Sequence, residues 1–509
     1  MKSITLKLKP LDMETGKPVA VLHEDDAEEL GHVPGDRIKV STPTKTFTLI
    51  ANTTRRLVRS GELGTFIEAT QLLNLPGESE VKVTIAPRPL SATAIKKKLS
   101  GGTLTDEEIG SIVRDIVSED LTSTELTAFV TGCYIRGMTL EETVSMVKHM
   151  VETGDRIEFE TGPVLDVHSI GGVPGNKYAL ITVPIAAAAG LMVPKTSSRA
   201  ITSAAGTADV VEVLANVKLD LSEIKRIVMK VGGVLAWGGA VKLAPADDII
   251  IRTERMLGID PRCQLLASVM SKKIAVGAER VVIDIPVGAG TKIENLEEAR
   301  DLAHDFMELG HRLGVQVETA ITYGEQPIGH AVGPALEARE ALAALMGNGP
   351  GSLIEKATSL AGAMLELGGV VPGGLGKERA MEILTSGKAY QKMKEIIEAQ
   401  GGNPEIKPED IPVGDKKEVL LAPTSGYITR IYNDRINEIA RTAGAPHDKG
   451  AGIKLLLKKG SKVNAGDPIM EIYAEHESRL DEALAVVKKR FPVKIEGMLL
   501  EKLSYRPRI

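Results

Sequence analysis

The chain of 509 residues has little cysteine, few aromatic side chains and no apolar run long enough to cross a membrane. Its two cysteines, Cys133 and Cys263, lie far apart and each within an apolar helical pattern, which argues against a disulfide framework or a thiolate metal site. One Trp, eight Tyr and six Phe leave few rings for stacking on single-stranded nucleic acid. The longest apolar stretch, 181–194, is interrupted by Pro184 and Gly190 and is too short for a membrane span.

An excess of charge of one sign is also missing. The 62 basic and 68 acidic side chains give a net charge of −6 at pH 7, and no long Lys/Arg run occurs, which argues against a protein that binds duplex nucleic acid. The first residues enter an alternating pattern directly, without the apolar segment of a secretory signal. We therefore expect a cytoplasmic protein that binds neither nucleic acid nor membrane.

The N-terminal residues 1–85 are expected to form a β-rich, barrel-like domain. Short alternating runs are broken by Pro-Gly turns, and residues 28–40 are echoed at 71–83. Two copies of one β-turn-β unit favour a small barrel with pseudo-twofold symmetry. The Pro-rich stretch 86–89 that follows indicates a linker.

A helical bundle domain is expected over residues 92–165 and again over about 244–276. Three capping boxes predict helix starts, because the threonine accepts from a first-turn N–H and the glutamate reaches back. They are Thr105 with Glu108, Thr122 with Glu125, and Thr139 with Glu142.

Residues 166–243 and 277–352 predict a central α/β domain with a largely parallel sheet. Apolar runs there alternate with amphipathic helices, which is typical of α/β layering. The runs are 180–189 and 281–285, and the helices are 221–231 and 296–313. Residues 353–509 are expected to form a C-terminal α+β domain, so the fold class is a multidomain α/β protein.

Three segments in or beside the α/β part concentrate polar groups. The first follows a short apolar run and contains Ser169, Gly171, Gly172 and Lys177. Glycines there let backbone N–H groups approach an anion at a helix N-terminus, and the hydroxyl and the ammonium add to such a site. The alternative is a tight turn between a strand and a helix.

The second segment, 195–209, carries five hydroxyls before Gly206, then Thr207, and the cations Lys195 and Arg199. This composition suits phosphate or sugar oxygens better than a core. The alternative is a hydroxyl-rich helix cap.

In the third segment, 259–273, Asp260 stands at an expected N-cap with Pro261 at the first helical position. Ser268 and Lys272 are four residues apart and share one helix face. Taken alone, Asp260 is either a helix cap or a catalytic residue.

These segments carry a resemblance to a known family. The run 197–212 resembles, along its whole length, the signature of the thymidine/pyrimidine-nucleoside phosphorylase family. The resemblance covers most of the chain after about residue 90 and continues into the C-terminal domain. Its further matches are 166–169, 243–247, 268–273 and 284–292.

Two differences from the nucleoside phosphorylases indicate which branch of the family the chain resembles. Val167 stands where they carry a phosphate-binding lysine, and their pyrimidine-reading arginine falls near Thr253. The loop after His168 is one residue longer and contains Lys177, which could replace the missing charge. With the added N-terminal barrel, the chain is most similar to the archaeal branch of the family that cleaves nucleoside 5′-monophosphates.

The resemblance implies that AMP and phosphate give adenine and ribose 1,5-bisphosphate, with CMP and UMP as other substrates and no cofactor or metal. The implied partners are a nucleoside 5′-monophosphate and inorganic phosphate, bound by a homodimer or a larger homo-oligomer. The alternatives are a pyrimidine-nucleoside phosphorylase, an anthranilate-type phosphoribosyltransferase and a non-catalytic nucleotide sensor. The implied nucleotide- and phosphate-binding residues are Gly172, Ser198, Arg199, Ala200, Ile201, Thr202, Ser203 and Thr207.

The resemblance also implies roles near the leaving base. Ser268 and Lys292 would contact substrate, and Asp260 would protonate the base, which calls for a pKa raised by partial burial. His168 is the alternative proton source, or else a packed residue that anchors its loop.

Overall fold

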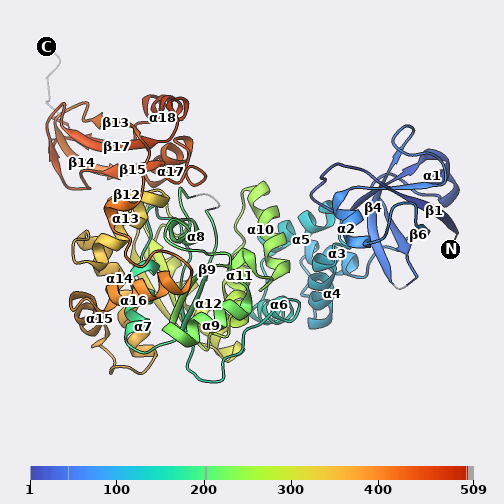
Figure 1. Cartoon of the computed structure of the whole chain (residues 1–509), viewed down its shortest axis with the longest axis horizontal. Coiled ribbons are helices and arrows are strands. Elements are labelled where there is room, and N and C mark those ends of the chain that lie inside the picture. The colour runs from blue at the N-terminus through green and yellow to red at the C-terminus, as the bar shows by residue number, and fades with distance from the viewer. Residues whose placement is uncertain (1, 44, 201–202, 500, 503–509) are drawn as a thin grey trace, which may run out of the picture. The chain divides into compact units, whose positions relative to one another are not determined.

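The computed structural model describes residues 2–43, 45–200, 203–499 and 501–502 (Figure 1). The chain forms two compact units, one of Met1–Thr153 with Ala244–Ser268 and one of Gly154–Leu243 with Val269–Ile509. Among the described residues, no helix combines the length and the apolarity that a membrane span needs.

The first unit begins with a closed barrel of six strands in the order β1-β5-β2-β4-β3-β6, which confirms the predicted barrel. The repeated segments are each the end of a helix, a Pro-Gly turn and a strand, so the repeat is α-turn-β and not the predicted β-turn-β. The strands are β1 (Ser3–Pro10), β2 (Val19–His23), β3 (Arg37–Ser41), β4 (Thr46–Thr54), β5 (Glu62–Thr65) and β6 (Glu80–Ile85), and the helices are α1 (Glu24–Leu30) and α2 (Ile67–Leu73).

A helical bundle completes the first unit. All three predicted capping boxes form, at the starts of α4, α5 and α6. The bundle helices are α3 (Ser91–Leu99), α4 (Asp106–Val117), α5 (Ser123–Arg136), α6 (Leu140–Glu152), α10 (Pro245–Leu257) and the first residues of α11 (Arg262–Ala275). The two cysteines, distant in sequence, meet here as buried thiols, with Sγ of Cys263 4.0 Å from the carbonyl oxygen of Cys133.

The α/β part of the second unit is built on parallel strands, as predicted. β11 (Gln316–Tyr323), β10 (Arg280–Val287) and β7 (Leu165–Ser169) form one parallel sheet. β8 (Val193–Ser197) pairs in parallel with β9 (Gly233–Trp237), and a bridge between Val164 and Met192 links the two sheets. The helices are α7 (Ala179–Ala188), α8 (Thr207–Val211), α9 (Leu221–Val231) and α12 (Leu296–Leu313).

The two apolar runs of this part have different structures. The run 281–285 lies in strand β10, whereas the run 180–189 is the buried helix α7 and not a strand. A helix that is apolar on every side has no amphipathic period, so its pattern resembles that of a central strand. Helices α14 (Gly351–Leu367) and α16 (Lys388–Ala399) pack on α7, and α15 (Gly376–Thr385) packs on α14.

The C-terminal part contains two antiparallel sheets. Their orders are β12-β15-β17-β13 and β16-β14-β18. The strands are β12 (Ala331–Val332), β13 (Lys416–Leu421), β14 (Gly426–Ile431), β15 (Gly452–Leu455), β16 (Lys462–Val463), β17 (Pro468–Ala474) and β18 (Val493–Glu496), and the helices are α13 (Pro334–Leu345), α17 (Asn433–Thr442) and α18 (Glu477–Lys489). Because α14, α15 and α16 pack with α7, they lie with the α/β layer, although the sequence assigned everything from residue 353 to the C-terminal domain.

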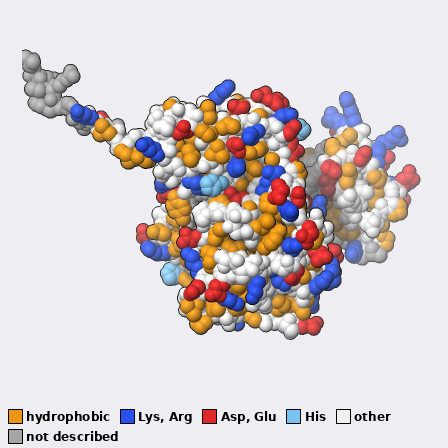
Figure 2. All heavy atoms as spheres, turned by 60° about the vertical axis from the view of Figure 1, so that its left-hand side comes forward, with side chains coloured by type: hydrophobic (Ala, Val, Ile, Leu, Met, Phe, Trp, Pro, Cys, Tyr) orange, Lys and Arg blue, Asp and Glu red, His pale blue; other side chains and the backbone are white. Residues whose placement is uncertain are grey.

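Acidic and basic side chains are interspersed over the face of the molecule that Figure 2 shows. This mixture agrees with the near balance of 62 basic and 68 acidic side chains in the sequence.

Candidate active site

The carboxyl ends of the parallel strands gather the predicted loops of the second unit. β7 ends at Ser169, β8 ends at Ser197 and β10 ends at Val287. Open α/β sheets bind their ligands outside this edge. We define the substrate loops as residues 170–178 and 198–206, the latter described except for 201–202, together with the turn 288–292.

The first substrate loop folds through left-handed glycines. Gly171 and Gly172 have φ of +86° and +91°, which residues with a Cβ rarely adopt. A Cβ on Gly172 would lie 2.8 Å from the backbone nitrogen of Lys292, so two predicted site residues meet here. The Ser169 hydroxyl accepts from Asn176 Nδ2 at 3.0 Å, which ties the end of β7 to the far end of the loop.

Lys177 has a different place from the one that the sequence suggested. Its side chain is fully buried, and Nζ donates to the carbonyl oxygens of Gly175, Ile328 and Ala331 at 2.8 to 3.0 Å. Nζ also lies 2.8 Å from Oε2 of Glu340. Since an ammonium has three donors, these contacts use Lys177 to hold the loop and leave nothing for an anion.

Two carboxylates, Asp209 and Glu212, hold the second substrate loop, and we call them the acidic clamp. Oδ2 of Asp209 accepts from the backbone N–H groups of Ala200 and Gly206 at 2.7 and 3.0 Å, which holds the two ends of the loop together. Arg199 donates to Glu212 at 2.7 Å and to Asp209 at 3.0 Å, and its guanidinium lies 4.8 Å from the Trp237 ring centroid. The hydrogen bond from Arg199 lowers the pKa of Glu212 to about 2.

The candidate residues of this loop therefore divide into two groups. Arg199 is ion-paired with Asp209 and Glu212. In contrast, Ser198 is exposed, and Ser203 and Thr207 are partly exposed. Ala200 contributes its backbone N–H to the clamp. The predicted residues Ile201 and Thr202 lie outside the described residues.

The imidazole of His168 is influenced by the charges of several lysines. Burial, followed by the charges of Lys273, Lys195, Lys272 and Lys292, holds the pKa of the imidazole well below its usual 6.5. His168 is therefore neutral at pH 7, which argues against it as the proton donor. Besides burial, the lowered pKa reflects a positive potential at His168, which would favour an anion nearby.

Two of those lysines, Lys195 and Lys273, are functional candidates that the structure adds to the individually predicted residues. Both are buried, and they share one carboxylate: Nζ of Lys273 is 2.6 Å from Oδ2 of Asp166, and Nζ of Lys195 is 3.9 Å from Oδ1. Burial and the neighbouring Lys273 charge lower the pKa of Lys195 to about 7. The sequence marks the segments of both, since Lys195 lies in the polar segment 195–209 and Lys273 in the matched segment 268–273.

The remaining candidates belong to the first unit. Ser268 donates to Oδ2 of Asp247 at 2.8 Å. Asp260 is exposed. The partial burial that was expected to raise its pKa is therefore not provided within the first unit. The carbonyl oxygen of Pro261 accepts from the N–H of Leu265 at 2.9 Å and α11 begins at Arg262. The helix cap is therefore Pro261, and Asp260 lies one residue before it and not at the cap as predicted.

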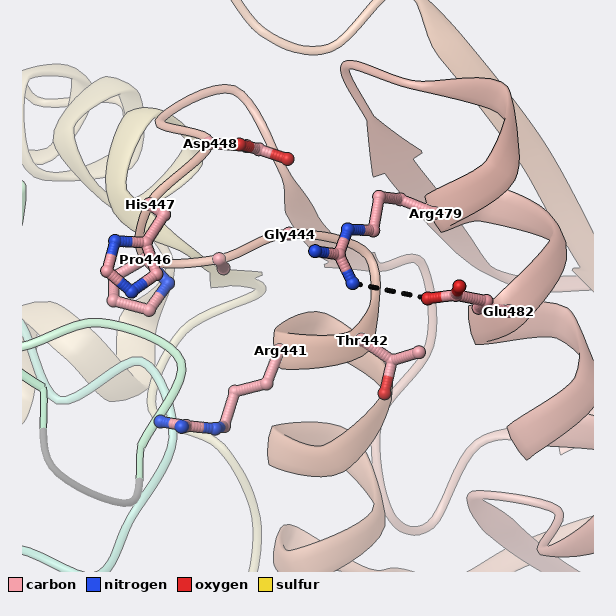
Figure 3. Close-up of a pocket in the computed structure, with 9 residues that line it drawn as sticks. Arg441, Thr442, Gly444, Pro446, His447, Asp448, Arg479 and Glu482 are labelled. Atoms are coloured by element: carbon pink, nitrogen blue, oxygen red, sulfur yellow. Dashed lines mark hydrogen bonds and ion pairs between the residues drawn. The ribbon is translucent and has the colours of Figure 1, made fainter.

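One pocket of about 410 Å³ lies at the end of α17 and is lined by residues other than the predicted ones. Its lining includes Arg441, His447 and the ion pair of Arg479 with Glu482 (Figure 3). Among the residues that the structure describes, no three His, Cys, Asp or Glu side chains are grouped so as to hold a metal ion.

Comparisons with known proteins match this architecture part by part. The helical bundle domain of the glycosyl transferase family matches residues 92–154, and the a/b domain of that family matches residues 161–390. The pyrimidine nucleoside phosphorylase C-terminal domain matches residues 427–494. The solved anthranilate phosphoribosyltransferase of Thermus thermophilus is 21% identical, with a TM-score of 0.50 over 61% of this chain and 99% of that chain, and shows a shared fold.

Full-length relatives decide the family. The AMP phosphorylase of Thermococcus kodakarensis is 56% identical over 98% of this chain and 99% of its own length. Those of Pyrococcus furiosus and Methanococcoides burtonii are 55% and 50% identical, over 97% and 98% of this chain and 98% and 99% of their own lengths. The chain belongs to the AMP phosphorylase family. In this member of the AMP phosphorylase family, the polar loops follow the carboxyl ends of β7, β8 and β10.

Proposed function

We propose that this protein catalyses the phosphorolysis of AMP to adenine and ribose 1,5-bisphosphate. The observation that carries the proposal is the buried pair Lys195 and Lys273 on the single carboxylate of Asp166. Asp166 and Lys195 lie in the strands that end where the substrate loops begin. Such a reaction must hold two anions, the incoming phosphate and the 5′-phosphate of the nucleotide. The full-length relatives named AMP phosphorylase support this substrate.

The proposed chemistry is a displacement at C1′ of the ribose. A phosphate oxygen forms a bond to C1′ while the N-glycosidic bond breaks, and its electron pair leaves with the base. The ring passes through an oxocarbenium-like state, so positioning and electrostatic stabilisation supply most of the rate. Protonation of the departing base by Asp260 completes the balance.

The contacts of the loop residues support the proposed roles. Backbone N–H groups at Gly171 and Gly172 and the Ser169 hydroxyl would bind one anion beside Lys292, since Gly172 and Lys292 are in contact. The exposed and partly exposed hydroxyls of the second loop would bind the other. Among the described residues the proposed set is Ser169, Gly171, Gly172, Ser198, Ser203, Thr207, Ser268, Lys272 and Lys292. Thr202 is added on the resemblance alone.

Two residues from the predicted set receive supporting roles in this proposal. Lys177 holds the first loop through three backbone carbonyls, and Arg199 holds the second through Asp209 and Glu212. Neither is proposed to bind the anion directly.

The test is phosphate-dependent release of free base from AMP, CMP, UMP and their nucleosides. The proposal expects release from AMP only when phosphate is present, with formation of ribose 1,5-bisphosphate. Equal turnover of adenosine and AMP would favour a nucleoside phosphorylase. A requirement for phosphoribosyl pyrophosphate and magnesium would favour a phosphoribosyltransferase, and thermal stabilisation by AMP without turnover would favour a sensor.

Three finer statements belong to the proposal. CMP and UMP are proposed as further substrates, measured in the same panel. The protein is proposed to work in the cytoplasm and as a homodimer or larger homo-oligomer, which light scattering at several concentrations would test.

A further inference from the structure

Helix α17 of the C-terminal part has two faces with different partners. Ile436, Ile439 and Ala440 are buried in the hydrophobic core of that part. Asn433, Asn437 and Arg441 follow one another at intervals of four residues and therefore share another face. This polar face contacts the substrate loops, although it lies more than two hundred residues further along the chain.

The C-terminal half of this face holds the second substrate loop. Oδ1 of Asn437 accepts from the backbone N–H of Ala204 at 3.2 Å. Arg441 donates to the carbonyl oxygen of Ser203 at 3.0 Å. Ala204 itself is buried in the same hydrophobic core as Ile436 and Ile439, so this part of the loop packs on the C-terminal part.

Asn433, the first residue of the helix, contacts the residue that follows β11. Nδ2 of Asn433 donates to the carbonyl oxygen of Gly324 at 2.8 Å. Gly324 lies against the turn after β10, since a Cβ on it would be 2.8 Å from Cγ2 of Thr291, the residue before Lys292. One helix face thus contacts the backbone beside two elements that carry predicted substrate residues.

Arg441 also forms one wall of the pocket at the end of α17. Figure 3 shows its side chain pointing away from Arg479 and Glu482. Lys449, which follows the pocket residue Asp448, adds a second contact between the C-terminal part and the second substrate loop: its Nζ lies 2.9 Å from Oε2 of Glu212 in the acidic clamp.

We propose that α17 is a positioning element for the substrate site: Asn433, Asn437 and Arg441 fix the backbone of the second substrate loop and of the turn before Lys292. The C-terminal part thereby sets the geometry in which the nucleotide and phosphate are bound. The assignment of these loops to substrate rests on the proposed function, whereas the restraint on the loop backbone does not.

The experiment combines amide hydrogen exchange with steady-state kinetics on the full chain. Asn437→Leu and Arg441→Met remove the two contacts to the second loop. Exchange of the amides between Ser203 and Thr207 should become about tenfold faster, the size of effect expected for one lost hydrogen bond. The KM for AMP or phosphate should rise about tenfold with kcat changed less than threefold, because the loop must be ordered before substrate binds.

The matched control is Arg435→Met. Arg435 lies on the same helix but donates to the carbonyl oxygen of Phe491 at 2.6 Å within the C-terminal part, so its loss should leave loop exchange and KM unchanged. Asn437→Asp keeps the acceptor and Arg441→Lys keeps a donor, and both should restore exchange and KM to within about threefold of wild type.

Unchanged exchange of the second loop in Asn437→Leu and Arg441→Met, or an equal change in Arg435→Met, would overturn the positioning role. If the wild-type chain releases no base from AMP, the proposed function fails, and the exchange experiment still decides whether α17 restrains the loop.

Discussion

Nζ of Lys273 lies 2.6 Å from Oδ2 of Asp166, and both side chains are buried. The same carboxylate is also the nearest negative charge to Lys195, at 3.9 Å, so two buried lysines share one aspartate. The excess positive charge lies beside His168, at the strand edge where the substrate loops begin. Burying two ammonium groups on one carboxylate lowers the stability of the fold, and it creates a positive potential at the proposed phosphate site.

Asp166→Asn should destabilise the second unit by about 3–5 kcal/mol, because it leaves two buried lysines without a counter-charge. The measurement is denaturant-induced unfolding followed by a probe in the α/β part. The control is Glu355→Gln, which removes an exposed ion pair with Lys377 at 2.9 Å and should cost less than about 1 kcal/mol. Equal stability of Asp166→Asn and wild type would show that the lysines are neutral in the folded protein.

Binding of a permanent dianion should weaken as pH rises through about 7, the pKa of Lys195. Below this pH the ammonium is charged and attracts the anion, and above it the charge is lost. Sulfate keeps one charge state across this range, so its inhibition constant should rise by up to about tenfold per pH unit between pH 7 and 9. His168 does not titrate in this window, because its pKa is held well below 6.5.

The matched variant for this experiment is Lys195→Met, in which the inhibition constant of sulfate should be higher at pH 6.5 and nearly independent of pH up to 9. A wild-type constant that does not change over this range would remove Lys195 from the anion site.

Arg199→Lys should be nearly as harmful as Arg199→Ala. Arg199 contacts both oxygens of Glu212, also reaches Asp209, and lies over Trp237, a geometry that a lysine does not reproduce. Both variants should lose about 1.5–3 kcal/mol of stability and should also raise the KM for AMP, because the loop loses its clamp. Calorimetry and kinetics on the two variants check this. A fully active Arg199→Lys variant would show that charge alone is needed.

Much of the fold could be predicted from the sequence because its signals are local. Each capping box needs only a threonine and a glutamate three residues apart, and all three formed. The duplicated Pro-Gly segments likewise indicated the barrel. The run 180–189, which is helix α7, was grouped with the run 281–285 because a helix buried on all sides loses the period that distinguishes it from a strand.

The site was less predictable because its contacts connect distant parts of the chain. Lys177 and Lys195 are both lysines beside small or hydroxyl residues, and only the structure shows that one holds carbonyl oxygens while the other lies near His168. The polar face of α17 did carry a signal, Asn433, Asn437 and Arg441 at intervals of four. Its partners lie over a hundred residues away, so the pattern alone could not identify them.

Asp260→Asn separates a proton donor from a residue that merely precedes a helix. Asparagine keeps the side-chain oxygen that a helix start uses, and the first helical hydrogen bond is made by the carbonyl oxygen of Pro261, so the substitution should cost little stability. It removes the carboxylic acid proton. Turnover of AMP should therefore fall by about 100-fold or more while AMP binding stays normal, and Asp260→Glu should recover part of the rate.

The loss in Asp260→Asn should also depend on the leaving base. A base that departs readily without protonation has less need of the donor, so the ratio of wild-type to variant kcat should be smaller for such a substrate than for AMP. A purely structural role would lower turnover by the same factor for every base. Near-normal turnover of AMP by the Asn variant would exclude Asp260 as the donor.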